Sequence, residues 1–71
     1  MDDIKNKLIN YIAEEQADID YYREQMENNP NCQDEYYYYI EQSRGVIATY
    51  YNKLISLGLT REEIDRELAY A

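Results

Sequence analysis

One short breaker divides this chain into two long segments with helical periodicity. Residues 28–31 read Asn-Asn-Pro-Asn and contain the only proline among 71 residues. Proline lacks a backbone N–H, and asparagine bonds to its own backbone, so both favour turns over helices. On either side, apolar residues recur at steps of three and four, which is the spacing of one helix face. We therefore expect two near-equal helices, over 3–28 and 32–57.

Local capping signals indicate a third helix over 61–70. Gly58 follows the last periodic residue, as glycine commonly does at a helix C-terminus. Thr60 and Glu63 have the spacing of a capping box, and Leu59 and Ile64 that of a hydrophobic staple. The predicted fold is all-α: a long antiparallel helical hairpin plus a short C-terminal third helix, similar to a three-helix bundle. It forms one domain over residues 1–71, and dimerisation is left open.

The two apolar stripes also predict a register. Facing residues of an antiparallel hairpin have a constant index sum, and the sum that pairs Ile12 with Ile47 places Glu15 opposite Arg44. The same register turns Tyr37 toward the first helix. We predict a structural ion pair between Glu15 and Arg44 that fixes the register, like a polar residue in a coiled-coil core. The alternative is that the two side chains line a small polar site.

Composition excludes several kinds of chemistry. The chain has no histidine, so it has no Ser-His-Asp or Cys-His nucleophile system and no histidine metal ligand. Seven basic residues against fifteen acidic ones give a formal net charge of −8, which leaves no basic stripe to bind nucleic acid directly. We expect no enzyme activity, no catalytic residue, no metal ligand and no cofactor.

The single cysteine and the hydropathy pattern bear on the compartment. Cys32 cannot form an internal disulfide, and it fits a reducing environment. No stretch of the sequence reaches the roughly 20 apolar residues of a membrane span. We therefore expect a cytoplasmic protein without membrane contact.

Acidic residues and tyrosines gather in the middle third of the chain. Residues 18–41 hold seven acidic residues against Arg23, a net charge of −6, and six of the ten tyrosines. Four successive tyrosines, 36–39, span about 300° around a helix and cannot all face one partner helix. The third helix folds back from Gly58 and cannot reach this end of the hairpin. Exposed aromatic surface is typical of binding sites. We predict that the following residues bind a protein partner: Tyr21, Tyr22, Tyr36, Tyr38, Tyr39, Asp18, Asp20, Glu24, Glu27, Asp34 and Glu35.

The expected function is a small acidic, non-catalytic protein-interaction module. Its partner is either a second copy, in a homodimer, or a basic surface of another protein. The alternative without a binding role is that tyrosine simply suits a solvent boundary, with its ring buried and its hydroxyl in water.

Two other functions stay open as alternatives. One is a phage or mobile-element inhibitor that mimics nucleic acid on a nucleic-acid-binding enzyme, because some small acidic phage proteins that inhibit bacterial defence nucleases are similar in size and charge. The other is a small Mg²⁺-dependent phosphohydrolase, because Glu14, Glu15 and Asp18 share a helix face. Such an enzyme needs a second acidic pair, and the facing segment has Arg44 where that ligand would stand.

Overall fold

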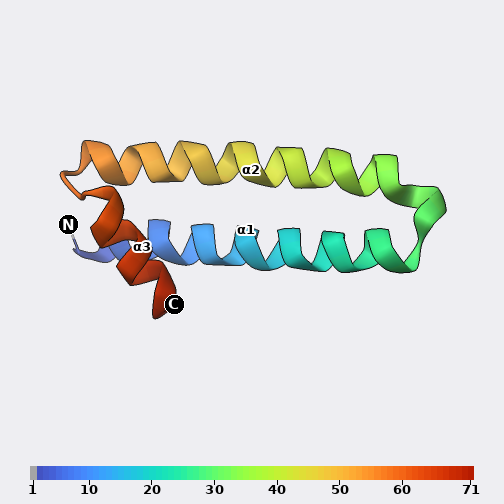
Figure 1. Ribbon diagram of the computed structural model, residues 1–71. Coiled ribbons are helices and arrows are strands. Elements are labelled where there is room, and N and C mark those ends of the chain that lie inside the picture. The colour runs from blue at the N-terminus through green and yellow to red at the C-terminus, as the bar shows by residue number, and fades with distance from the viewer. Residues whose placement is uncertain (1) are drawn as a thin grey trace.

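The hairpin consists of two long helices that lie side by side and antiparallel (Figure 1). The computed structural model describes residues 2–71. Helix α1 spans Asp2–Asn28 and α2 spans Gln33–Ser56, with the 3₁₀ turn η1 (Pro30–Cys32) between them, and α3 spans Arg61–Ala69. The described part of the chain contains three α-helices and no strand, which confirms the all-α fold. Each α-helix begins and ends within one residue of the range expected from the sequence.

The Asn-Asn-Pro-Asn segment makes the turn between the long helices. The backbone N–H of Asn29 donates to the carbonyl oxygen of Gln25 at 2.8 Å, which closes the last turn of α1. Pro30 starts η1, where its missing N–H has no partner to lose. The N–H of Cys32 then donates to the carbonyl oxygen of Asn29 at 3.0 Å. These bonds reverse the chain within a few residues and set α2 against α1.

Gly58 ends α2 in the way that the sequence predicts. Its φ of +103° lies in the left-handed region that glycine adopts without steric cost. The N–H of Gly58 donates to the carbonyl oxygen of Ile55 at 3.0 Å, and that of Leu59 donates to Leu54 at 3.2 Å. This pair of bonds is a Schellman motif, and it turns the chain back toward α1.

Helix α3 begins with the predicted capping box and closes this end of the hairpin. The Thr60 hydroxyl accepts a bond from the N–H of Glu63 at 3.2 Å, and the Glu63 carboxylate accepts one from the N–H of Thr60 at 3.3 Å. Ile64 is fully buried. The aliphatic cluster that surrounds it draws on all three helices: Leu8, Ile9, Ile12, Leu54 and Ile64.

The face that α2 turns toward α1 differs from the expected face at Tyr37 and Arg44. Ile40 and Leu54 are buried, and the other buried position of α2 is Ser43, at 6% exposure, and not Arg44. Tyr37 is 58% exposed, so the prediction that it faces α1 is wrong. The stripe with a 4,3,4,3,4,3 spacing is instead made of these buried and half-buried residues: Tyr36, Ile40, Ser43, Ile47, Tyr50, Leu54 and Leu57.

Candidate functional site

The end of the hairpin opposite α3 holds the candidate site. We call residues 18–41 the hairpin tip; they comprise the last turns of α1, the turn η1 and the first turns of α2. The molecule is 44 Å long and 20 Å wide, and α3 crosses only the other end (Figure 1). The hairpin tip is therefore built from two helices alone, and no third element covers it within residues 2–71.

Five tyrosine rings of the hairpin tip form one connected group, which we call the tyrosine cluster. Tyr22 of α1 stands with its ring centroid 5.5 Å from that of Tyr39 and 6.2 Å from that of Tyr36. Tyr36 and Tyr39 are 6.2 Å apart, and Tyr21 and Tyr38 extend the group on either side at 5.9 and 6.0 Å. The tyrosine cluster consists of the five tyrosines that the sequence singled out, brought together across both helices.

The tyrosine cluster is only partly buried. Tyr22 and Tyr36 are half-buried where the two helices meet. Tyr21, Tyr38 and Tyr39 are 55%, 60% and 42% exposed. Since aromatic side chains bring large apolar area, this leaves a continuous aromatic surface in contact with water.

Tyr36 lies in the part of the tyrosine cluster most shielded from solvent. Loss of solvation raises the pKa of its hydroxyl above the ordinary value of 10.0, and the neighbouring ionisable groups of Tyr21, Cys32, Glu35 and Tyr39 raise it further. Both causes disfavour a negative charge at this position. The hydroxyl therefore stays neutral and remains a hydrogen-bond donor well into the alkaline range.

A shallow hollow of about 340 Å³ lies beside the tyrosine cluster on α2. It is lined by Asp34, Glu35, Tyr38 and Tyr39. Each carboxylate stands four residues before a ring, so the four side chains form two adjacent columns on one helix face. The hollow thus combines two carboxylates with two aromatic rings.

The other predicted acidic residues are distributed around the hairpin tip. Asp18, Asp20, Glu24 and Glu27 are exposed on α1 and do not gather at the hollow beside Tyr38. None of them, and neither Asp34 nor Glu35, forms an ion pair within the described residues. Their charge therefore acts as a broad negative field over the end of the molecule.

The predicted ion pair between Glu15 and Arg44 is wrong. Arg44 is exposed, and its guanidinium bonds to the carboxylate of Glu41, three residues away on the same helix, at 3.2 Å. Ser43 takes the buried position opposite α1 because a small hydroxyl is buried at much lower cost than a guanidinium. Arg44 follows it by one residue and is rotated by about 100°, into water.

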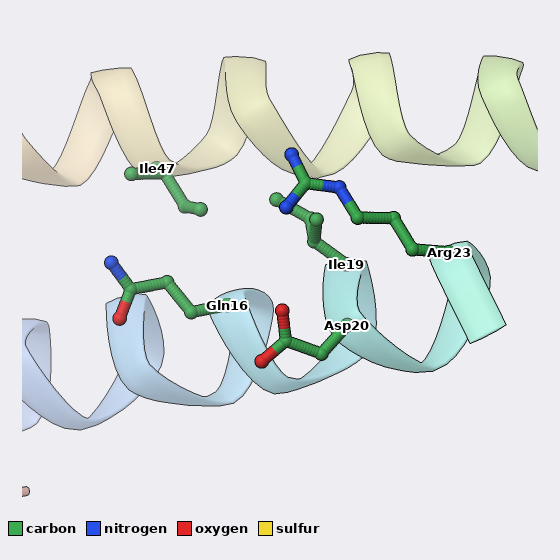
Figure 2. A pocket seen from close by; sticks show the side chains of 5 residues that line it. All are labelled: Gln16, Ile19, Asp20, Arg23 and Ile47. Atoms are coloured by element: carbon green, nitrogen blue, oxygen red, sulfur yellow. The ribbon is translucent and has the colours of Figure 1, made fainter.

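A second hollow, of about 360 Å³, lies between the long helices midway along the hairpin. Figure 2 shows Gln16, Asp20 and Arg23 on α1 around a floor made by Ile19 and by Ile47 of α2. The Arg23 side chain extends across the floor toward α2 (Figure 2). Nothing in the sequence pattern predicted this hollow; the signal that marks one of its edges is Arg23, the single basic residue in the hairpin tip.

The described residues offer neither a metal centre nor a membrane span. Between Asp2 and Ala71, no three carboxylate or thiol side chains come close enough together to hold a metal ion. None of the helices in this range is long and apolar enough to cross a membrane.

Comparisons of this chain with protein-family models, with curated proteins and with solved structures find no match. The class is therefore defined by the molecule itself: a small three-helix protein with an aliphatic core at one end and an exposed, acidic tyrosine cluster at the other.

Proposed function

We propose that this chain is a non-catalytic interaction module and that its hairpin tip binds a basic surface of another protein. The observation that carries the proposal is the tyrosine cluster, whose five rings are in contact across both helices while three of them stay 42–60% exposed. Tyrosine is among the residues that contribute most to binding energy at protein interfaces.

Contact between the rings makes the surface suited to binding. A ring that already packs against its neighbours has fewer rotamers to lose when a partner arrives, which lowers the entropic cost of association. Tyr39 has three such neighbours, in Tyr22, Tyr36 and Tyr38. The surface is therefore organised before any partner binds.

The charge around the tyrosine cluster favours a basic partner. Residues 18–41 carry a net charge of −6, which is three quarters of the charge of the whole chain. A negative field of this kind accelerates encounter with a positive surface and opposes a negative one. A second copy fits this tip less well, because two tips in contact would bring fourteen carboxylates together against two arginines.

A basic groove that otherwise holds nucleic acid belongs to this class of partner. In that case the chain would act as an inhibitor by occupying the groove, with its carboxylates in place of phosphates. Such binding would weaken steeply with salt, as contacts between exposed charges do.

Affinity capture followed by calorimetry tests the proposal. A partner isolated from an extract of the source cells is purified, and its affinity is measured for the wild type and for Tyr38→Ala/Tyr39→Ala. We expect the double variant to lose at least about tenfold in affinity, since two exposed interface rings are removed. The matched control is Tyr11→Ala/Tyr70→Ala, which removes two exposed tyrosines outside the hairpin tip and should bind as the wild type does.

Two results would overturn the proposal. One is equal affinity of the wild type and of the tip variant for the purified partner. The other is a partner whose binding strengthens as salt is added. Light scattering gives a separate check, because a molar mass of 8.6 kDa at all concentrations identifies a monomer and removes the second copy as the partner.

A further inference from the structure

We propose that the hollow lined by Asp34, Glu35, Tyr38 and Tyr39 is a binding site for one arginine side chain of the partner. This inference rests on the proposed function and names the group that the hairpin tip recognises. The hollow holds about 340 Å³ and combines aromatic faces with carboxylates, which are the two surfaces that a guanidinium group binds.

The geometry of α2 brings these surfaces together. Helical side chains lean toward the N-terminus, so the rings of Tyr38 and Tyr39 lie over the turn that carries Asp34 and Glu35. The two ring centroids are 6.0 Å apart with an interplanar angle of 67°. The rings therefore form a corner, and a flat cation that stacks on one ring stays within reach of a carboxylate.

Tyr39 gives the corner a rigid wall. Its ring centroid lies 5.5 Å from that of Tyr22 on α1 and 6.2 Å from that of Tyr36, so neighbours from both helices hold it in place. Tyr38 contacts only Tyr39 within the tyrosine cluster and is 60% exposed. We infer that Tyr39 is the fixed wall and Tyr38 the ring that adjusts to the incoming side chain.

Elsewhere the chain covers tyrosine rings with its own cations. The Lys53 ammonium lies 5.9 Å from the ring centroid of Tyr50, and the Arg61 guanidinium lies 5.9 Å from that of Tyr51. Within residues 2–71, no ring of the tyrosine cluster has such a cation over it. The hairpin tip thus presents the ring faces without the cation, and beside them stand carboxylates that form no ion pair in the described structure.

Arginine fits this site better than lysine. Its guanidinium is planar, stacks on an aromatic face and presents paired N–H donors to a carboxylate, whereas a lysine ammonium is a compact and strongly hydrated charge. Both side chains satisfy the charge of the site, but only arginine uses the ring and the carboxylate at once. A preference for arginine over lysine is therefore the signature of this site.

A titration of the full chain with tri-arginine and with tri-lysine peptides, followed by amide NMR shifts, tests the inference. We expect tri-arginine to shift the amides of residues 34–39 and to bind about threefold more tightly than tri-lysine, because stacking adds to an equal charge. Equal affinity of the two peptides would overturn the arginine site. So would shifts confined to the acidic residues of α1.

Two variants separate the ring from the charge. Tyr38→Leu keeps apolar area but removes one of the two aromatic faces, so it should reduce the preference for arginine and leave tri-lysine binding unchanged. Asp34→Asn/Glu35→Gln should weaken both peptides. The control Glu14→Gln/Glu62→Gln lowers the net charge equally, at exposed residues outside the hairpin tip, and should leave the arginine preference intact. All four positions of the site are exposed, and circular dichroism verifies that each variant folds.

The outcomes distinguish the arginine site from the proposed function. If both peptides bind the hairpin tip equally, or if neither binds while the captured partner still requires Tyr38 and Tyr39, the arginine site is wrong and the basic-partner proposal stands. If neither peptide binds and the tip variant retains its partner, both are wrong.

Discussion

The two ends of the hairpin share the same two helices but differ in how completely their side chains are covered. At the α3 end, Ile12, Leu54 and Ile64 are 0% exposed, and α3 closes the cluster. At the hairpin tip, Ile19 and Ile40 are buried between the two helices, but the tyrosine rings beside them are only partly covered, and Tyr38 and Tyr39 remain 60% and 42% exposed. One end therefore resembles a domain core, and the other resembles half of an interface.

The difference shows what a third helix adds to a pair of helices. Aliphatic side chains stabilise most when they are fully removed from water, and at the α3 end the third helix completes that burial. Tyrosine rings pack against one another at tilted angles across the helices and edge to face within a helix, and their hydroxyl groups can stay hydrated, so they need no third helix over them. Stability is accordingly expected to come mainly from the α3 end, and the hairpin tip is free for binding.

The largest expected effect is at the α3 end. Replacing fully buried Ile64 by alanine should lower the free energy of unfolding by about 2–5 kcal/mol, because it leaves a cavity beneath α3. The matched change Ile4→Ala, at a position 56% exposed, should cost less than about 1 kcal/mol. Urea denaturation followed by circular dichroism measures both, and equal costs would contradict the assignment of the core to this end.

The two glycines should respond in opposite directions. Gly58→Ala forces a side chain into the left-handed region at φ +103° and should destabilise by about 1–2 kcal/mol. Gly45→Ala should stabilise by about 0.5–1 kcal/mol, because Gly45 lies inside α2 and a Cβ there meets no atom within 4 Å. Thermal unfolding of the two variants checks the sign. Loss of stability in Gly45→Ala would show that this open face is covered by something in solution.

A smaller effect is expected at alkaline pH. The Tyr51 hydroxyl donates to the Asp65 carboxylate at 3.0 Å, and desolvation together with this bond raises its pKa above the ordinary 10.0, while Arg61 partly opposes the rise. Folding thus favours the neutral hydroxyl. Its contribution is complete below about pH 10 and is lost as the pH rises from there through the raised pKa.

Tyr51→Phe tests this contribution. The variant should lose about 0.5–1 kcal/mol at neutral pH, since a net hydrogen bond is removed, and its stability should then fall less than that of the wild type between pH 9 and 11. Tyr70→Phe, at a position 86% exposed, is the control and should follow the wild-type curve. The same pH dependence in Tyr51→Phe and in the wild type would show that Tyr51 does not cause the alkaline loss.

The smallest effect concerns the middle of the hairpin, between the two ends. Arg44→Met should change stability by no more than about 0.5 kcal/mol, because its ion pair with Glu41 is exposed on both sides. In a double-mutant cycle, Glu15→Leu and Arg44→Met should add to within about 0.5 kcal/mol. A coupling energy well above that would show that Glu15 and Arg44 do interact between the helices.

Much of the fold was predictable because its signals are local. The turn at Pro30, the glycine at position 58 and the capping box of Thr60 and Glu63 each depend on a few neighbouring residues, and the structure contains all of them. The ends of the helices follow from these turn and capping signals. That some tyrosines of the hairpin tip stay exposed was also predictable, because four successive tyrosines cannot all be buried by one helix, but Tyr37 was expected to face α1 and is exposed.

The register of α2 was not predictable in the same way. Two alternative stripes of α2 both contain Ile40, Ile47 and Leu54. They differ in which of two neighbouring residues they include at 36 or 37, at 43 or 44, and at 50 or 51. Tyrosine occupies both members of the first and last pairs, so only the middle pair distinguishes the stripes. The predicted stripe ran through Arg44, and the pairing with Glu15 followed from that register, whereas the low cost of burying Ser43 decides for the other stripe.

The direction of the hairpin has a practical consequence for anything attached to this chain. The described chain starts at Asp2 and ends at Ala71, and both lie at the α3 end of a molecule 44 Å long (Figure 1). A tag, a fluorophore or a surface linker joined at either terminus therefore projects away from the tyrosine cluster. When the chain is immobilised in this way, every copy presents its hairpin tip to the solution.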